Sequence, residues 1–198
     1  VERVRRLELP QVPDETPIRY QVSDFIPAMT HQNPPAWTPH FRPFALDKLF
    51  DLTPGDFHNA SDLPRGEIPL ISCGDADNGI AAFVSVPPEN IYHGRLTIAF
   101  NGMNTLTTKF HFYNFAAKDD VAICVPKKPL RLTTLVFVQL MMNRERWRYS
   151  YYRKCFMDKL RRQSVMLPEK GGSVDEDLIE LLLEATTYWS ALKSRLAA

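Results

Sequence analysis

The residues with the clearest chemical character lie in a basic, tyrosine-bearing segment at positions 144–168. Its cations are Arg144, Arg146, Arg148, Arg153, Lys154, Lys159, Arg161 and Arg162, its tyrosines are Tyr149, Tyr151 and Tyr152, and its acids are Glu145 and Asp158. Arginine and lysine neutralise phosphates and release counterions, while tyrosine offers a flat face and a hydroxyl to a base, sugar or phosphate. The segment therefore predicts contact with nucleic acid. The alternative is a solvated basic helix that follows a tyrosine-rich strand packed in the core.

A second set of polar residues lies in predicted loops, where flexible side chains can reach base edges. In the major groove, asparagine forms a bidentate contact with adenine, and a basic side chain forms one with guanine. The candidates for base contact are Asn78, Asn101, Asn104 and Lys109. Asn78 and Asn101 each precede a glycine, so turn formation is the alternative explanation for these two residues.

The sequence contains no recognisable catalytic motif. Two sets are conceivable, a thiol triad of Cys73, His93 and Asp75, and an acid–base or metal pair of His111 with Asp119 or Asp120. Neither set has the spacing of a nucleophile motif or of a metal site. The sequence also contains no P-loop, no GxGxxG and no methyltransferase motif. We therefore expect a protein that is not itself an enzyme and that uses no cofactor and no metal.

The overall composition is that of a globular protein in water. The chain has 44% hydrophobic and 24% charged residues, and no apolar run reaches the roughly 20 residues that a membrane-spanning helix needs. Its 24 basic and 23 acidic residues nearly cancel, so nucleic-acid contact must depend on uneven placement of charge. The stretch 175–184 supplies that asymmetry, because it carries acids and no cation. The composition therefore predicts no membrane contact and surfaces of opposite charge.

Cysteine usage and the start of the sequence bear on the compartment. Cys73, Cys124 and Cys155 are widely spaced and form no CxxC pair, so neither a disulfide framework nor a zinc site is predicted. The opening residues VERVRRLELP lack the apolar core of a signal peptide. Both features predict a cytoplasmic protein with reduced cysteines. Because the sequence starts at Val1, we also expect processing, or a fragment of something longer.

The elements that must position these residues are mainly strands. Short apolar runs alternate with Gly, Asn, Asp and Pro from about residue 44 to residue 168. Strands are predicted at 67–72, 80–86, 96–100, 109–115, 121–125 and 165–167, with turns at 77–79 and 101–102. Helices are predicted at 132–146, capped by Thr133 or Thr134, and at 154–163. The fold class is therefore α+β, a β-rich domain with a few helices.

Different segments precede and follow this domain. Half of the 16 prolines lie before position 44, so residues 1–43 are predicted to form an extended arm ahead of a domain at 44–170. Ser173 and Glu176 match a capping box that opens a long amphipathic helix over 173–198. Its apolar residues Leu178, Leu182, Ala185, Trp189, Leu192 and Leu196 recur with a period of about 3.5 residues. This seam predicts pairing with another helical partner, or packing on the domain itself.

Five segments in order resemble the target-recognition domain of restriction-modification specificity subunits, of the type I kind and their type II relatives. They are FALDKLFDLTPG at 44–55, IPLISCGDADNGIAAFV at 68–84, LTIAFNGMNTLTTKFHFYNF at 96–115, KPLRLTTLVFVQLMM at 128–142 and RWRYSYYRKCFMDKLRRQSVMLP at 146–168. The last segment resembles a closing unit made of a tyrosine-bearing strand, a basic helix and a short strand. The acidic helix after it stands where the family has a long spacer helix.

The resemblance implies sequence-specific recognition of double-stranded DNA by a non-catalytic component. A DNA methyltransferase, with or without an endonuclease, would supply the chemistry, and the C-terminal helix would bind that partner or a second copy of the chain. In this interpretation Arg148, Arg153, Lys154, Lys159 and Arg162 hold phosphates, Tyr149, Tyr151 and Tyr152 order the segment or touch DNA, and Asn78, Asn101, Asn104 and Lys109 face bases. The alternative function is a protein-interaction module that uses the basic segment and the C-terminal helix.

Overall fold

The structure is a computed structural model, and it describes residues 40–149, 153–186, 189 and 193–194. The chain divides into two compact units, of which the larger is Pro39–Glu180 and the smaller combines 1–38 with 181–198. The larger unit holds both predicted groups of DNA-contacting residues, apart from Tyr151 and Tyr152, which lie outside the described residues.

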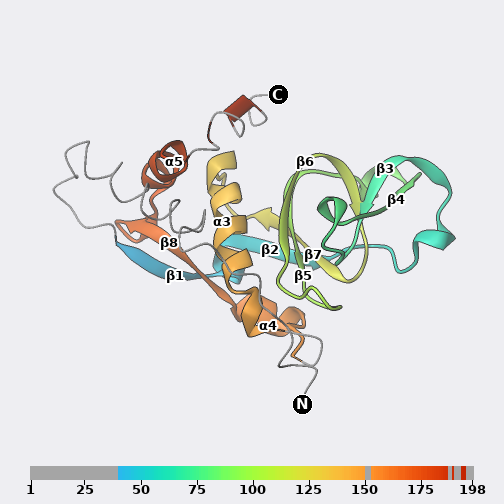
Figure 1. Cartoon of the computed structure of the whole chain (residues 1–198), viewed down its shortest axis with the longest axis horizontal. Helices are drawn as coiled ribbons and strands as arrows, with labels where there is room; N and C mark the ends of the chain where they lie inside the picture. The colour runs from blue at the N-terminus through green and yellow to red at the C-terminus, as the bar shows by residue number, and fades with distance from the viewer. Residues whose placement is uncertain (1–39, 150–152, 187–188, 190–192, 195–198) are drawn as a thin grey trace, which may run out of the picture. The chain divides into compact units, whose positions relative to one another are not determined.

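Within the described residues, the larger unit contains two β-sheets (Figure 1). The strands are β1 (Phe41–Ala45), β2 (Phe50–Pro54), β3 (Arg65–Ile71), β4 (Ile80–Val84), β5 (Tyr92–Ala99), β6 (Thr108–Ala117), β7 (Val121–Pro126), β8 (Ser164–Lys170) and β9 (Ser173–Val174). One sheet has the order β1-β8-β9 and the other β2-β7-β5-β6-β3-β4. All pairs are antiparallel except β3 with β6, which run parallel at Leu70–Ala116 and Ile71–Ala117.

Helical segments connect and cover these sheets. The α-helices are α2 (Leu46–Leu49), α3 (Leu132–Arg144), α4 (Met157–Arg162) and α5 (Glu176–Glu184). Short 3-10 turns are η1 (Ala60–Asp62), η2 (Asp77–Gly79), η3 (Pro88–Asn90) and η4 (Arg146–Arg148). The predicted α+β class is confirmed, and so are the six predicted strands and the helices at 132–144 and 157–162. Among the described residues no helix is long and apolar enough to cross a membrane.

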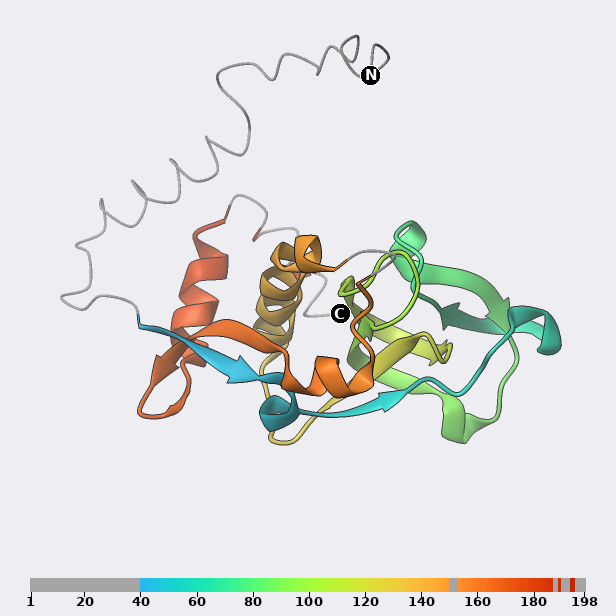
Figure 2. The same ribbon diagram turned by 90° about the horizontal axis from the view of Figure 1, so that it is seen from below.

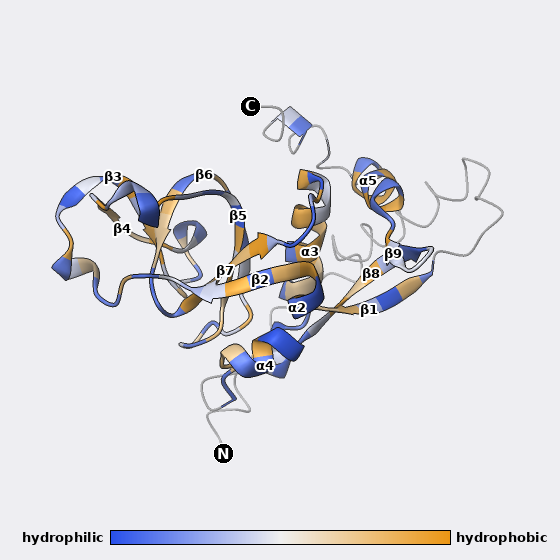
Figure 3. Cartoon of the chain, turned by 180° about the vertical axis from the view of Figure 1, so that it is seen from behind, coloured by the Kyte–Doolittle hydropathy of each residue, from blue (hydrophilic) through white to orange (hydrophobic). Residues whose placement is uncertain are grey.

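The core of the larger sheet is formed by buried side chains of its central strands. Residues 121–124 of β7 are all buried, so both faces of this strand are covered, and its two edges pair with β2 and β5. Hydropathy colouring shows the hydrophobic end of this strand in orange (Figure 3). Ile71, Phe115 and Ile123 come from three strands and pack in one fully buried cluster. Burial of large apolar side chains of this kind is the main force that holds the sheet together.

Helix α3 lies between the two sheets and contacts β6 and β8 (Figures 1 and 2). Leu135, Val138 and Met142 form its buried face. Helix α3 also supplies polar groups to β6. The first half of β6 pairs only with β5, so the backbone groups on its other edge need hydrogen-bond partners. Asn143 bonds both the N–H and the C=O of Thr108, each at 2.9 Å, and Gln139 Oε1 accepts the Phe110 N–H at 2.6 Å. These two amides tie α3 to this edge of β6.

The predicted helix starts are wrong in detail. Helix α3 is preceded by Arg131 and has no side-chain cap, and Thr134 instead donates to Glu176 Oε1 at 2.6 Å. Ser173 lies in β9, so no capping box forms, and Asp175 Oδ1 accepts the Leu178 N–H at 3.1 Å at the start of α5. The carboxylate of Glu176 is unavailable for a capping box because it is bonded to α3.

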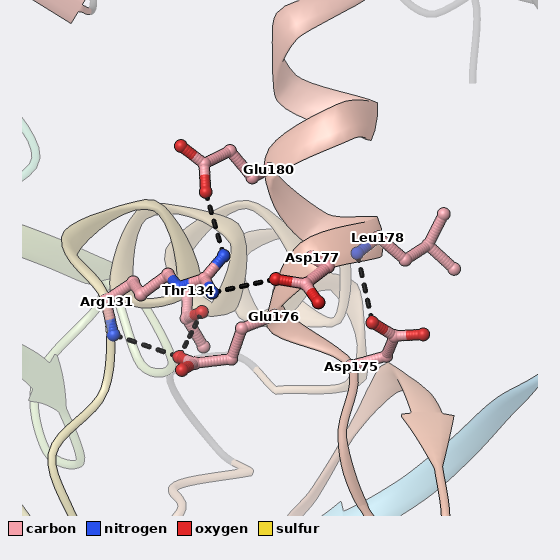
Figure 4. Close-up of polar contacts among 7 residues, drawn as sticks. All are labelled: Arg131, Thr134, Asp175, Glu176, Asp177, Leu178 and Glu180. Carbon is pink, nitrogen blue, oxygen red and sulfur yellow. Dashed lines mark hydrogen bonds and ion pairs between the residues drawn. The ribbon is translucent and has the colours of Figure 1, made fainter.

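The acidic start of α5 is bonded within the larger unit (Figure 4). Arg131 contacts Asp177 Oδ1 at 2.7 Å and Glu180 Oε2 at 2.9 Å, and its backbone N–H donates to Glu176 Oε1 at 2.9 Å. These bonds join the N-terminus of α3 to the first turns of α5. The acids at 176–180, expected to form an oppositely charged face, are therefore largely engaged by one arginine.

The C-terminal helix is shorter over the described residues than the predicted span of 173–198. Helix α5 ends at Glu184, and the residues described after Thr186 are Trp189, Lys193 and Ser194, which are again helical. Leu192 and Leu196 of the predicted seam lie outside the described residues. Leu178 and Leu182 are buried within the single chain, whereas Leu181 is 51% exposed.

Candidate nucleic-acid interface

The basic segment forms a concave surface, which we call the basic hollow. It is a cavity of about 900 Å³ lined by Trp147, Arg148, Tyr149, Arg153, Lys154, Phe156 and Lys159. Four of these residues are cations and none is acidic. The surface is therefore suited to an anion that is large enough to meet several cations at once, as a phosphate backbone does.

Turn η4 positions the first wall of the hollow. The end of α3 continues into η4 because the Arg148 N–H bonds to the Glu145 carbonyl at 3.0 Å. The Arg148 guanidinium pairs with the Glu145 carboxylate and lies 5.5 Å from the centre of the Trp147 ring. Trp147 is 77% exposed, which is unusual for so large an apolar side chain. The closing segment 146–168 was expected to open with a tyrosine-bearing strand, whereas residues 146–148 form a 3-10 turn and Tyr149 follows it with extended backbone.

Helix α4 and the residues before it form the second wall. Leu160 is fully buried and anchors the helix, so Lys159 on its other face is exposed. Lys154 Nζ lies 6.0 Å from the ring centre of Phe156, which is 55% exposed. Both walls thus present an exposed aromatic ring with a cation next to it. Exposed rings and cations of this kind are common where proteins contact nucleic acid.

The other cations of the segment have different surroundings. Arg161 contacts Asp158 Oδ1 at 3.4 Å and the Leu52 carbonyl at 3.5 Å, so part of its charge is already compensated. Arg162 is exposed, has no bonding partner among the described residues, and lies outside the lining of the hollow. The basic hollow therefore contains Arg148, Arg153, Lys154 and Lys159 of the five predicted phosphate contacts.

Tyr149 lines the hollow, and its hydroxyl is hydrogen-bonded. The hydroxyl donates to Gln163 Oε1 at 2.9 Å, which ties the residue to the end of α4. Burial raises the pKa of this hydroxyl, and a hydrogen bond with the buried Cys155 raises it further. Tyr149 therefore stays neutral in the physiological range and contributes order to the segment.

The second predicted group, Asn78, Asn101, Asn104 and Lys109, surrounds the loop at 72–79 between β3 and β4. Lys109 is only 8% exposed, and its Nζ donates to the Gly74 carbonyl. Asn104 Nδ2 donates to the Cys73 carbonyl at 3.1 Å. Asn101 Oδ1 accepts the Gly102 N–H at 2.9 Å, which is the turn geometry expected for it. These side chains hold loop backbone, and burial lowers the pKa of the Lys109 ammonium.

Asn78 and His111 form a polar group against β6. Asn78 Nδ2 donates to Tyr113 Oη at 3.0 Å and lies 3.3 Å from His111 Nδ1. The other imidazole nitrogen, Nε2, lies 2.9 Å from Thr97 Oγ1. Burial, with a smaller contribution from Lys109, lowers the pKa of His111 to about 3. His111 is thus a neutral, hydrogen-bonded histidine packed within the sheet. Its surroundings do not support the catalytic pair with Asp119 or Asp120 that was considered from the sequence.

One ion pair connects the loop with the basic hollow. Arg146 of η4 contacts Asp75 Oδ2 at 2.9 Å, next to Trp147 and Arg148 in the sequence. The hydrogen bond from Arg146 lowers the pKa of the Asp75 carboxyl, so this acid remains charged. The two groups predicted separately from the sequence are therefore brought together. This link could not be predicted from the sequence, because nothing in the local pattern pairs residues that lie 71 positions apart.

Comparisons with known proteins agree with this fold. No protein-family model matches the chain. The specificity subunit S.BcgI of the type II restriction enzyme BgcI from Heyndrickxia coagulans is 26% identical over 139 residues, which covers 69% of this chain and 40% of that protein. The resemblance to restriction-modification specificity subunits is thereby confirmed at the level of sequence.

Solved structures show the same fold. The S subunit of a type I restriction-modification system from M. genitalium aligns with a TM-score of 0.59 at 13% identity, over 91% of this chain and 48% of that subunit. The HsdS subunit from Thermoanaerobacter tengcongensis aligns with a TM-score of 0.52 at 15% identity, over 99% of this chain and 47% of that subunit. The chain thus spans about half the length, or less, of the relatives that it matches.

Proposed function

We propose that this chain is the DNA-recognition part of a restriction-modification specificity subunit and selects the duplex sequence on which partner subunits act. The observation that carries the proposal is the basic hollow, four cations and two exposed aromatic rings without an acid, on a fold shared with type I specificity subunits. In this proposal residues 44–170 are the target-recognition domain and 1–43 an arm whose last residues enter strand β1. Residues 173–198 are a segment for pairing with a partner or a second copy, and its first residues form β9.

The basic hollow would hold the phosphate backbone. Arg148, Arg153, Lys154 and Lys159 line it, and the exposed Arg162 follows on the same helix as Lys159. Contacts between cations and phosphates supply affinity and orientation without sequence information. Trp147 and Phe156 would pack against sugars or base edges, since their rings are exposed beside these cations.

Base selection would come from the loop at 72–79 and the neighbouring turn at 101–107. Asn78 keeps its Oδ1 and Asn101 its Nδ2 without a hydrogen bond among the described residues, so these atoms are available for DNA. Asn104 and Lys109 would act mainly by holding the loop in place, because their donors are bonded to its backbone carbonyls.

Catalysis would belong to partners. We propose that a DNA methyltransferase subunit or domain, with or without an endonuclease, performs the reaction on the sequence that this chain selects. Methyltransferases must take their target base out of the stack, and a fixed grip on the neighbouring duplex would support that step. Because its proposed target is cellular DNA, the cytoplasm is the compartment that we propose for it.

The proposal is tested by the salt dependence of duplex binding. Fluorescence anisotropy with a labelled duplex pool would give the affinity at several salt concentrations, and each phosphate contact adds about −0.9 to the log–log slope. If the four cations of the hollow each meet one phosphate, the slope is about −3.6 or steeper. Failure of the chain to bind any duplex at low salt would contradict the proposal.

Matched variants locate the contact. Arg153→Ala should make the slope shallower by about one unit. Lys170→Ala is the control, because Lys170 is an exposed cation at the end of β8 that is farther from α4, and it does not line the hollow. Equal changes in both variants would show that general charge and not the hollow drives binding.

A further inference from the structure

The loop at 72–79 has an unusual backbone at its tip. Asp77, Asn78 and Gly79 follow one another with φ values of 49°, 53° and 82°. The left-handed region is costly for residues with a Cβ, and only Gly, Asn and Asp adopt it readily. The tip is therefore a tight turn whose backbone conformation is favoured by its own residue types.

The surroundings hold the loop at several points. Lys109 bonds the Gly74 carbonyl, Arg146 bonds the Asp75 carboxylate, and Asn78 bonds the side chain of Tyr113. The Ser72 N–H also bonds the Gly79 carbonyl at 2.8 Å, which closes the loop at its base. A loop fixed in this way presents its remaining side chains in one orientation, which reduces the entropy lost when a ligand binds.

The loop at 72–79 carries two charged side chains, Asp75 and Asp77, and only Asp77 is still to be accounted for. It is exposed, and its carboxylate bonds to no side chain or backbone group of the described residues. The neighbouring acid, Asp75, is compensated by Arg146, whereas Asp77 is not. Asp77 lies two residues from the Asp75–Arg146 pair, which connects this loop to the proposed phosphate-binding surface. An uncompensated carboxylate there is unfavourable near bound DNA, unless the DNA offers it a hydrogen-bond donor.

In the major groove, cytosine is the one base that presents a hydrogen-bond donor without an acceptor beside it on the same base. Cytosine presents the N4 amino group, guanine presents two acceptors, adenine an acceptor with its donor, and thymine an acceptor with a methyl group. A carboxylate therefore favours cytosine and is repelled most by guanine. Building on the function proposed above, we infer that Asp77 is a base-reading residue that selects cytosine through a hydrogen bond from N4 to its carboxylate.

The test compares base preferences of the full 198-residue chain and its variants. Selection from a randomised duplex pool, followed by sequencing, gives the preferred sequence of the wild type. Anisotropy then measures duplexes that differ at one position, where replacing cytosine by guanine should weaken wild-type binding about tenfold. Asp77→Asn is the main variant, because asparagine tolerates the left-handed backbone and keeps the loop folded. Glu89→Gln, an exposed acid on η3, is the matched control.

The outcomes separate this inference from the function on which it rests. Asp77→Asn and Asp77→Ala should lose the cytosine preference at one position, keep the preferences elsewhere, and bind unselected duplex at least as tightly as the wild type. Glu89→Gln should keep every preference. Binding with an unchanged cytosine preference in both Asp77 variants, or loss of preference for another base, would overturn the inference alone. Absence of duplex binding by the wild type would overturn the proposed function as well.

Discussion

The ion pair between Arg146 and Asp75 should couple the stability of the loop at 72–79 to the DNA affinity of the basic hollow. The two side chains are 34% and 54% exposed and their charged atoms lie 2.9 Å apart. Ion pairs with this exposure contribute about 0.2–1 kcal/mol to the free energy of unfolding, because solvent screens them. We therefore expect Arg146→Ala and Asp75→Ala each to lower that free energy by less than about 1 kcal/mol.

The effect on binding should be larger for one variant than for the other. Arg146→Ala removes a cation beside the hollow and also leaves the Asp75 carboxylate uncompensated, so duplex affinity should fall. Asp75→Ala leaves the Arg146 guanidinium free to meet phosphate, so its affinity should be equal to that of the wild type or higher. The double variant should bind better than Arg146→Ala alone, because the repulsive carboxylate is gone.

A double-mutant cycle measures this coupling. Urea unfolding of the four proteins gives the coupling in stability, and anisotropy at one fixed salt concentration gives the coupling in binding. A coupling of about 0.5 kcal/mol or more in the binding cycle is the expected result. Additive effects in both cycles would refute the reasoning, since they would show that the pair does not connect the loop with the hollow.

Three further predictions follow from the same contacts. His111 has a pKa of about 3 in the fold and about 6.5 when unfolded, so the unfolded state binds the extra proton and stability should fall as the pH drops below 6.5. The slope due to this residue is at most about 1.4 kcal/mol per pH unit, and urea unfolding of His111→Gln should show a shallower dependence on pH than the wild type. Trp147→Ala should weaken duplex binding by about tenfold in anisotropy while leaving unfolding unchanged, because the ring is 77% exposed; unchanged affinity would remove Trp147 from the interface. If α5 mediates self-association, Leu181→Glu should yield a smaller species in sedimentation, since Leu181 is exposed whereas Leu182 is buried; the same species in both proteins would exclude pairing through this face.

The strands of this fold could be predicted because their signals are local. In β3, β6 and β7, β-branched and aromatic residues lie between turn residues, and burial fixes the register of a strand through its alternation. The 77–79 turn was also predictable, since Asp, Asn and Gly are the residues that tolerate positive φ. Strands β1 and β2 and helix α2 were not predicted. Pro43 was counted among the prolines that indicated an extended arm, although β1 is an edge strand, where proline is tolerated.

The caps and the site depended on contacts that are distant in sequence. The Ser173–Glu176 pattern is a valid capping signal, but Glu176 is engaged by Arg131 and Thr134, and Asp175 takes the N-cap role expected of Ser173. The cations around α4 were found by composition alone. The engagement of Lys109 with Gly74, 35 positions away, could not be found in this way, because an interior lysine and a surface lysine have the same local pattern.

Hydrogen–deuterium exchange with and without duplex DNA tests the central claim most directly, because it reports which backbone segments a bound duplex covers or stabilises. With the duplex selected by the wild-type chain, exchange should slow at 72–79 and across 146–163. It should be unchanged at 60–66, which comprises η1 and the start of β3, at the other end of that strand from the loop. Protection confined to other segments, with none in the loop or in the basic hollow, would contradict this account of how the chain recognises DNA.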